Sequence, residues 1–124
     1  MRRRKRKTSV LGKKKFMLHK EAARTLVHAR IAHFNLHYKV SVARVAIRNQ
    51  KTRWGSCSKK GNLNFNYKLA LIRPELADYV VVHELCHLKE FNHSKQFWSH
   101  VGETIPNYRE LRAELRKGFK NVSL

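Results

Sequence analysis

The sequence is short of acidic residues, of cysteine and of long apolar runs, and each shortage narrows the class of protein. Only 8 Asp and Glu stand against 28 Lys and Arg in 124 residues, which gives a formal net charge of +20. The two cysteines, Cys57 and Cys86, form no CxxC pair, so the chain is not a disulfide framework and a reducing compartment is favoured. No run approaches the roughly 18 apolar residues of a membrane span, so we expect no membrane association and a cytoplasmic location.

The positive charge is general but is concentrated at the start of the chain. Residues 1–15 hold nine Lys and Arg and no acid. A surplus of this sign attracts polyanions, which favours nonspecific contact with nucleic acid through this segment; a role in solubility is the simpler alternative. We interpret residues 1–18 as a basic, flexible arm and residues 19–124 as a single domain, whose length allows one modest core.

The spacing of apolar residues predicts both helices and strands. The expected elements are a helix over 19–38, strands over 40–47, 53–58 and 62–66, a helix that Pro74 opens, a helix that Ser94 caps, and a last helix after Pro106. Gly61 supplies a positive φ in the hairpin turn before the third strand. The sequence therefore predicts an α+β fold with an N-terminal helix, a three-stranded, mainly antiparallel sheet, a central helix and two C-terminal helices.

Residues 83–87 read HELCH and follow the apolar run YVVV. On a helix, apolar side chains cover most of the circumference, and the polar gap holds His83, Glu84 and His87. Buried polar groups need partners, and two imidazoles four residues apart can bind one Zn²⁺ while the glutamate takes a proton from zinc-bound water. This is the HExxH arrangement of zinc peptidases. The alternative is a buried, hydrogen-bonded histidine pair without a metal.

His93 is the expected third ligand, and it constrains the backbone. In an unbroken helix its side chain would point away from the metal, so the helix must end near residues 90–92, where Asn92 tolerates a left-handed conformation. The alternative is that His93 lies at the surface and that Glu103 or another downstream acid completes the site. Three protein ligands leave one position open, which is typical of catalytic and not of structural zinc.

Neighbouring patterns do not extend this site. The three histidines have metzincin spacing, but Glu90 occupies the glycine position of that pattern and no methionine follows it, which argues against a metzincin. His33 and His37 share the four-residue spacing without an adjacent glutamate, so we interpret them as structural. Cys86 lies on the apolar flank and is expected in the core. No oxyanion-stabilising group is assigned; the candidates are Asn66, His100, Tyr108 and Arg109.

Two segments resemble those of the YgjP-like zinc metallopeptidases, which are relatives of the WLM and SprT-like groups among the zincins. They read KTRWGSCSKKGNLNFNYKLA and DYVVVHELCHLKEFNHSKQFW. The resemblance implies a small zincin-like domain, with His83, His87 and His93 as metal ligands and Glu84 as catalytic base. It implies a zinc-dependent hydrolase that cleaves proteins or peptides. WLM and SprT-like relatives act on proteins crosslinked to DNA, which by analogy would bring this chain near nucleic acid.

Two functions therefore follow from the sequence. The first is a zinc metallopeptidase, in which the strand around TRWGSCS or its hairpin partner forms a sheet edge above the metal that a peptide joins as an extra strand. Gly55 would allow the backbones to approach closely, while Trp54, Leu63 and Phe65 would belong to the core. The alternative is a metal-stabilised nucleic-acid-binding module without hydrolytic activity.

Overall fold

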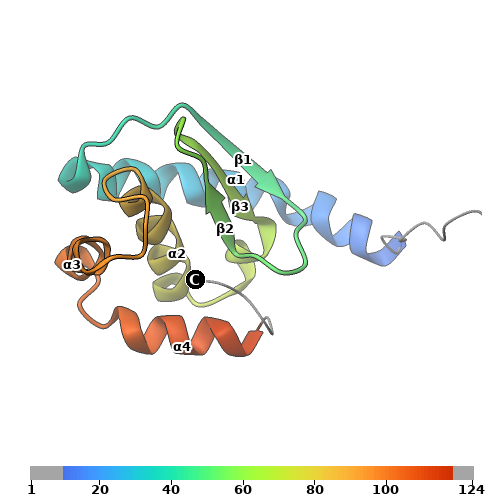
Figure 1. The fold of residues 1–124 in the computed structure, drawn as a ribbon. Coiled ribbons are helices and arrows are strands. Elements are labelled where there is room, and N and C mark those ends of the chain that lie inside the picture. Colours follow the sequence, from blue (N-terminus) through green and yellow to red (C-terminus); the bar gives the residue numbers. More distant parts are fainter. Residues whose placement is uncertain (1–9, 119–124) are drawn as a thin grey trace, which may run out of the picture.

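The structure, a computed structural model, describes residues 10–118 and combines helices with a small sheet (Figure 1). Its elements are α1 (Val10–Tyr38), β1 (Arg44–Arg48), β2 (Gly55–Cys57), β3 (Asn62–Asn66), the 3₁₀ helix η1 (Tyr67–Leu71), α2 (Pro74–His87), α3 (Lys95–Thr104) and α4 (Tyr108–Gly118). The predicted α+β class and the order of elements are confirmed. No helix in this part of the chain is long and apolar enough to cross a membrane.

The sheet is mixed, with the strand order β1-β3-β2. β2 and β3 are antiparallel, as expected for strands joined by a tight turn in which Gly61 has a φ of 92°. β1 pairs in parallel with β3, so the prediction of a mainly antiparallel sheet is wrong for this pair. The cause is the segment between β1 and β2, which passes the end of β3 and is held there by Asn66, whose side-chain nitrogen donates to the carbonyls of Gln50 and Arg53 at 2.9 Å. β2 is therefore an edge strand.

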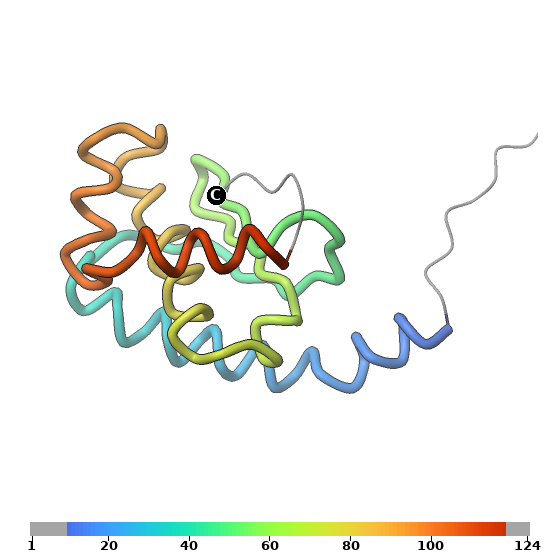
Figure 2. The backbone as a smooth tube through the Cα atoms, turned by 90° about the horizontal axis from the view of Figure 1, so that it is seen from below, coloured from blue at the N-terminus to red at the C-terminus, as the bar shows by residue number. Residues whose placement is uncertain are grey.

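Helix α1 begins at Val10, nine residues before the predicted start at His19. Its early turns pack on η1, where the Phe16 ring meets Tyr67 edge-to-face at 5.5 Å and His19 stacks on Tyr67 at 6.4 Å. Figure 2 shows the first turns of α1 extending past the rest of the fold. Residues 10–18 of the predicted arm are therefore helical, while residues 1–9 lie outside the described residues.

Helix α2 is the centre of the fold and lies between the sheet and α4 (Figure 1). Ten of its 14 residues are buried, because apolar side chains cover nearly its whole circumference. A bidentate pair fixes α1 against it: Arg30 donates to the two carboxylate oxygens of Asp78 at 2.7 and 3.1 Å. The same burial places His83 and Glu84 inside the molecule, at 3% and 2% exposure.

Candidate metal centre

The chain reverses direction just after the last histidine of α2. The helix ends at His87, three residues before the predicted range, and the backbone N–H groups of Lys89 and Glu90 donate to the Cys86 carbonyl at 3.0 and 2.9 Å. Asn92 does not take the expected left-handed conformation, since Lys39 alone among the described non-glycine residues has a positive φ. The Ser94 hydroxyl accepts from the Phe97 N–H at 3.3 Å, which confirms the predicted cap of α3.

This turn brings His93 back to the two histidines of α2, as predicted. One ring nitrogen from each of His83, His87 and His93 lies within 4.8 Å of the others. The Nε2 atoms of His87 and His93 are 3.0 Å apart. The Glu103 alternative is not supported, because that carboxylate lies 2.9 Å from the ring of His37, and hydrogen bonding from His37 lowers its pKa.

The hydrogen bonds of the histidine rings leave one nitrogen of each of His83 and His87 available to bind a cation. The Nδ1 of His87 donates to the Phe91 carbonyl at 2.7 Å, which turns its Nε2 toward the cluster. The Nε2 of His83 is buried and has no hydrogen-bond partner in the described part of the chain. A buried ring nitrogen that has no hydrogen-bond partner and faces two further imidazoles is typical of a metal-binding histidine. The residues therefore fit a bound metal ion.

Aromatic rings of α3 enclose one side of the cluster, and burial favours the neutral form of His87 and His93. The Phe97 ring lies 4.6–5.0 Å from all three histidine rings. Burial lowers the pKa of His93 from 6.5 to about 4, and the nearby His83 and His87 lower it further. Burial also lowers the pKa of His87, and the nearby His83 makes a second, smaller contribution in the same direction. Neutral imidazole is the form that binds a metal, so the site is prepared for one at neutral pH.

Glu84 lies between the histidines and the edge strand β2. Its Oε2 is 3.3 Å from the Nδ1 of His83. A Cβ placed on Gly55 would lie 3.2 Å from that Oε2 and 3.1 Å from the Asn64 carbonyl oxygen, so only glycine lets β2 run this close to the carboxylate. Trp54, one residue earlier, is buried as predicted.

A cleft of about 280 Å³ opens onto these groups. It is lined by Arg53, Gly55, Ser56, Cys57, His83, Glu84, His87, Phe91 and His93. Burial raises the pKa of the Cys57 thiol to about 12, with a further contribution from the Glu84 charge, so Cys57 is a neutral wall of this cleft. The other thiol, Cys86, is fully buried in the core, as predicted.

Several residues of the site have no signal in the sequence. Arg53 and Phe91 line the cleft, and the Trp98 ring lies 5.8 Å from that of His83. Of the four oxyanion candidates, Asn66 caps η1 and holds the β1–β2 segment, and the backbone carbonyl of His100 accepts from Tyr38. The other two candidates, Tyr108 and Arg109 of α4, line a neighbouring cleft.

The mixed sheet, the central helix and the convergent histidines define a metallopeptidase domain. The chain belongs to the YgjP-like family, because the sequence pattern described as "YgjP-like, metallopeptidase domain" matches residues 3–118. No curated protein matches the chain.

Two solved structures share the fold. One is the metallopeptidase zymogen abylysin of Pyrococcus abyssi, with a TM-score of 0.70 and 23% identity over 79% of this chain and 99% of that one. The other is the metallopeptidase zymogen jannalysin of Methanocaldococcus jannaschii, with a TM-score of 0.57 and 20% identity over 77% of this chain and 95% of that one.

Proposed function

We propose that the protein is a zinc-dependent peptidase in which His83, His87 and His93 hold the ion and Glu84 is the general base. The observation that supports this most is the convergence of the three ring nitrogens beside a carboxylate that is 2% exposed. Three imidazoles favour zinc over magnesium or calcium. When bound, zinc lowers the pKa of water and polarises a carbonyl group.

Glu84 performs the proton transfers in this scheme. Its carboxylate accepts the proton of the attacking water and returns it to the leaving amine. Its burial against His83 and Gly55 restricts it to one orientation, which keeps the accepting oxygen beside the histidine cluster. The protein side chains thus supply a positioned base, while the rings of α3 exclude water from the opposite side.

The substrate is proposed to be a polypeptide that pairs with β2. No strand of the described chain pairs with the outer edge of β2, and the cleft is lined by all three of its residues. An extended peptide can add to such an edge through main-chain hydrogen bonds. This pairing would place the peptide next to Glu84 at Gly55, where β2 has no side chain.

The test is peptide cleavage by the zinc-loaded protein and its Glu84→Gln variant. We expect the variant to lose about 10²- to 10⁴-fold in turnover, since it loses only the base, and to keep its zinc. Glu75→Gln, in the exposed first turn of the same helix, is the matched control and should cleave normally. Unchanged cleavage by Glu84→Gln would refute the assignment. Unfolding by EDTA without any turnover would favour the non-hydrolytic binding module.

The net charge of +20 favours a second property, nonspecific binding of nucleic acid through the basic N-terminus. Deletion of residues 1–9 removes six Lys and Arg. We expect weaker binding of single-stranded DNA and a shallower dependence of affinity on salt, because fewer counterions are released. Peptide cleavage should not change. Equal affinity of the deleted and full-length chains would contradict this proposal.

A further inference from the structure

The first turns of α1 carry an exposed apolar surface. Seven large apolar side chains are exposed in the described part of the chain, and four of them lie within residues 10–18. These four are Val10, Leu11, Met17 and Leu18, with exposures of 59–76%. A group of exposed apolar side chains that is rimmed by polar residues is typical of an interaction site. The metal centre gives no reason for this one.

Helical spacing gathers the four side chains into one stripe. At about 100° per residue, Val10, Leu11, Met17 and Leu18 fall within an arc of about 120° around the helix, and we call them the N-terminal stripe. Phe16, which packs on Tyr67, lies on the opposite side of the helix. The N-terminal stripe therefore points away from the fold, while Phe16 anchors the helix that presents it.

Lysines surround the N-terminal stripe. By the same helical spacing, Lys13 and Lys15 lie at its two edges and Lys14 lies within it. All three are exposed. The one acidic residue of α1, Glu21, pairs with Arg24, so no acid of this helix offsets the lysine charges. A lysine inside an apolar stripe can lay its alkyl chain on the apolar surface and extend its amine to water or to an anion.

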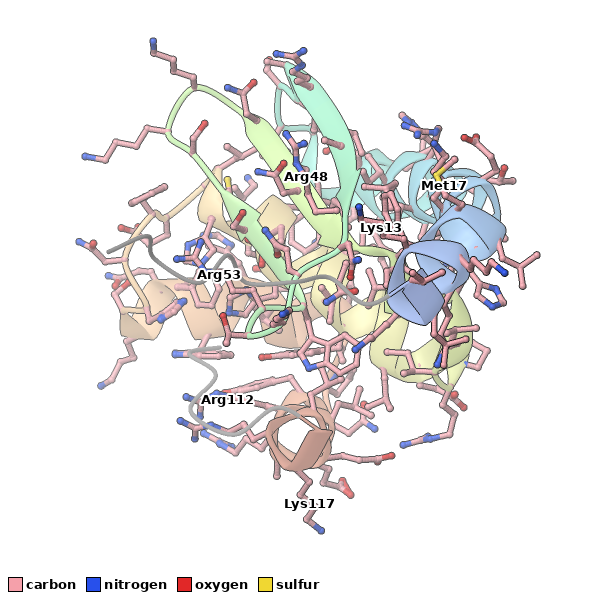
Figure 3. The ribbon with its side chains drawn as sticks, turned by 90° about the vertical axis from the view of Figure 1, so that its right-hand side faces the viewer. Lys13, Met17, Arg48, Arg53, Arg112 and Lys117 are labelled. Atoms are coloured by element: carbon pink, nitrogen blue, oxygen red, sulfur yellow. The ribbon has the colours of Figure 1, made fainter. Side chains whose placement is uncertain are left out.

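This end of α1 projects from the fold. Figure 2 shows its first turns extending past the other elements. In Figure 3, Lys13 and Met17 lie on these turns, apart from Arg53, which lines the metal cleft. The surface is formed by α1 alone, through Val10, Lys13, Lys14, Met17 and Leu18. It is therefore the side of a single helix and not a groove between two elements.

We propose that the N-terminal stripe docks on an anionic lipid surface, with the first turns of α1 lying in the plane of the interface. A helix with lysines beside its apolar face binds there through buried apolar area and through attraction to anionic headgroups. The expectation of no membrane association rests on the lack of a spanning segment, which an interfacial helix does not need. This inference goes beyond the proposed function, since it depends on neither the metal nor a peptide substrate.

The charges and the apolar side chains together favour lipid over other occupants. A second copy of the chain would bring its own Lys13–Lys15 against these lysines. Nucleic acid would pair with the lysines but would leave the aliphatic side chains in water, because bases stack on aromatic rings. A helix of another protein fits a groove, which the side of one helix does not form. An anionic lipid surface matches both features.

The test is cosedimentation of the full-length protein with lipid vesicles. One set of vesicles contains phosphatidylcholine and phosphatidylserine in equal amounts, and the other contains phosphatidylcholine alone. We expect about tenfold tighter binding to the anionic vesicles or more, since each lysine near the surface contributes about fivefold. Equal binding to both sets, or no binding to the anionic set, would overturn the proposal.

Leu11→Gln/Leu18→Gln separates insertion of the N-terminal stripe from adsorption by charge alone. Both positions are exposed and glutamine is a good helix former, so the fold should be retained. We expect the double variant to bind anionic vesicles about tenfold more weakly than the wild type. Binding that is undiminished in this variant would show that charge alone holds the protein to the vesicle, and the docking surface would be rejected.

Two single variants of α1 form a matched pair. Leu18 and Leu36 are 74% and 76% exposed, and Leu36 lies near the far end of the same helix. Leu18→Gln should weaken binding to anionic vesicles by about threefold to fivefold, whereas Leu36→Gln should bind like the wild type. Equal losses in the two variants would contradict a surface confined to the first turns of α1.

Further measurements identify the other possible occupants. Sedimentation velocity without lipid would detect a dimer, and a dimer that Leu11→Gln/Leu18→Gln dissociates would assign the stripe to a second copy of the chain and overturn lipid docking. Oligothymidylate binding should be equal in the wild type and this variant. If it falls as much as vesicle binding does, the surface serves nucleic acid and the proposal is wrong.

Lipid docking and the peptidase assignment can fail independently. Cleavage of a soluble peptide by the zinc-loaded protein should be the same in the wild type and in Leu11→Gln/Leu18→Gln, because the N-terminal stripe lies apart from the metal cleft. Vesicle binding without any cleavage would refute the peptidase assignment and leave lipid docking in place. Cleavage without vesicle binding would refute lipid docking alone.

Discussion

At the scale of single residues, Gly55 allows the edge strand to touch the proposed base. We predict that Gly55→Ala lowers kcat/KM for peptide cleavage by about tenfold to a hundredfold, because its Cβ would lie 3.2 Å from Glu84 Oε2 and displace that carboxylate. Steady-state kinetics measure the effect. Gly118→Ala is the control, since its Cβ would also make a tight contact, 3.3 Å from Trp54, but outside the metal cleft. Full activity of Gly55→Ala would contradict the proposed placement of the base.

His93 gives a pH dependence whose sign follows from its lowered pKa. The pKa is 6.5 in the unfolded chain and about 4 in the folded one, so the unfolded chain binds more protons between these values. The free energy of unfolding of the metal-free protein should therefore fall as the pH drops from 6.5 to 4. Urea denaturation of EDTA-treated protein at pH 7 and pH 4.5 measures this.

The contribution of His93 is isolated by substitution. His93→Gln should show a smaller loss of stability on acidification than the wild type, because one of the groups responsible is removed. His28→Gln, at an exposed position of α1, should behave like the wild type. An identical pH dependence in all three proteins would show that His93 is not buried among its neighbours as described.

Residue patterns predict only part of this site. The ligands on α2 follow from helical spacing alone, because His83 and His87 share one face whatever the rest of the fold does. The prediction of His93 as a third ligand also depends on a reversal of the chain after α2. This reversal occurs without the left-handed conformation expected at Asn92. Trp98 could not be predicted, because it meets the site only through the packing of α3 against α2.

At the scale of elements, the Arg30–Asp78 pair sets how α1 packs on α2. Its side chains are 32% and 22% exposed and its geometry is bidentate, so it should stabilise more than a surface pair. We predict that Asp78→Asn lowers the free energy of unfolding by about 1–2 kcal/mol. Arg24→Gln, which removes the exposed pair with Glu21, should cost less than about 0.5 kcal/mol. Equal losses in urea denaturation would contradict this role.

Two element-level predictions were wrong for reasons of tertiary structure. The alternation of apolar and polar residues in β1 predicts a strand but not its direction. That direction depends on the side of β3 on which β1 pairs, which is set by the β1–β2 segment that Asn66 holds. The start of α1 is at Val10 and not at His19, because the cluster Lys13–Lys15, which is typical of a flexible basic arm, lies within the helix. In the fold, Phe16 packs on Tyr67 and continues the helix.

At the scale of the whole molecule, the metal should stabilise the fold through linkage. Its proposed ligands come from α2 and from the segment that leads into α3, so binding joins two elements. We predict that zinc raises the Tm of the full-length protein by several degrees and that EDTA reverses the rise. His87→Ala should abolish the effect, whereas His33→Ala should not. A Tm that zinc leaves unchanged would show that the folded chain does not bind it preferentially.

The most direct measurement is X-ray absorption at the zinc edge of the zinc-loaded protein in solution, with His93→Ala as the comparison. The proposed centre predicts three imidazole nitrogens at about 2.0–2.1 Å and one solvent oxygen, and one imidazole fewer in His93→Ala. A spectrum with two imidazoles in the wild type, or with a thiolate or carboxylate of the protein in the fourth position, would contradict a catalytic metal centre.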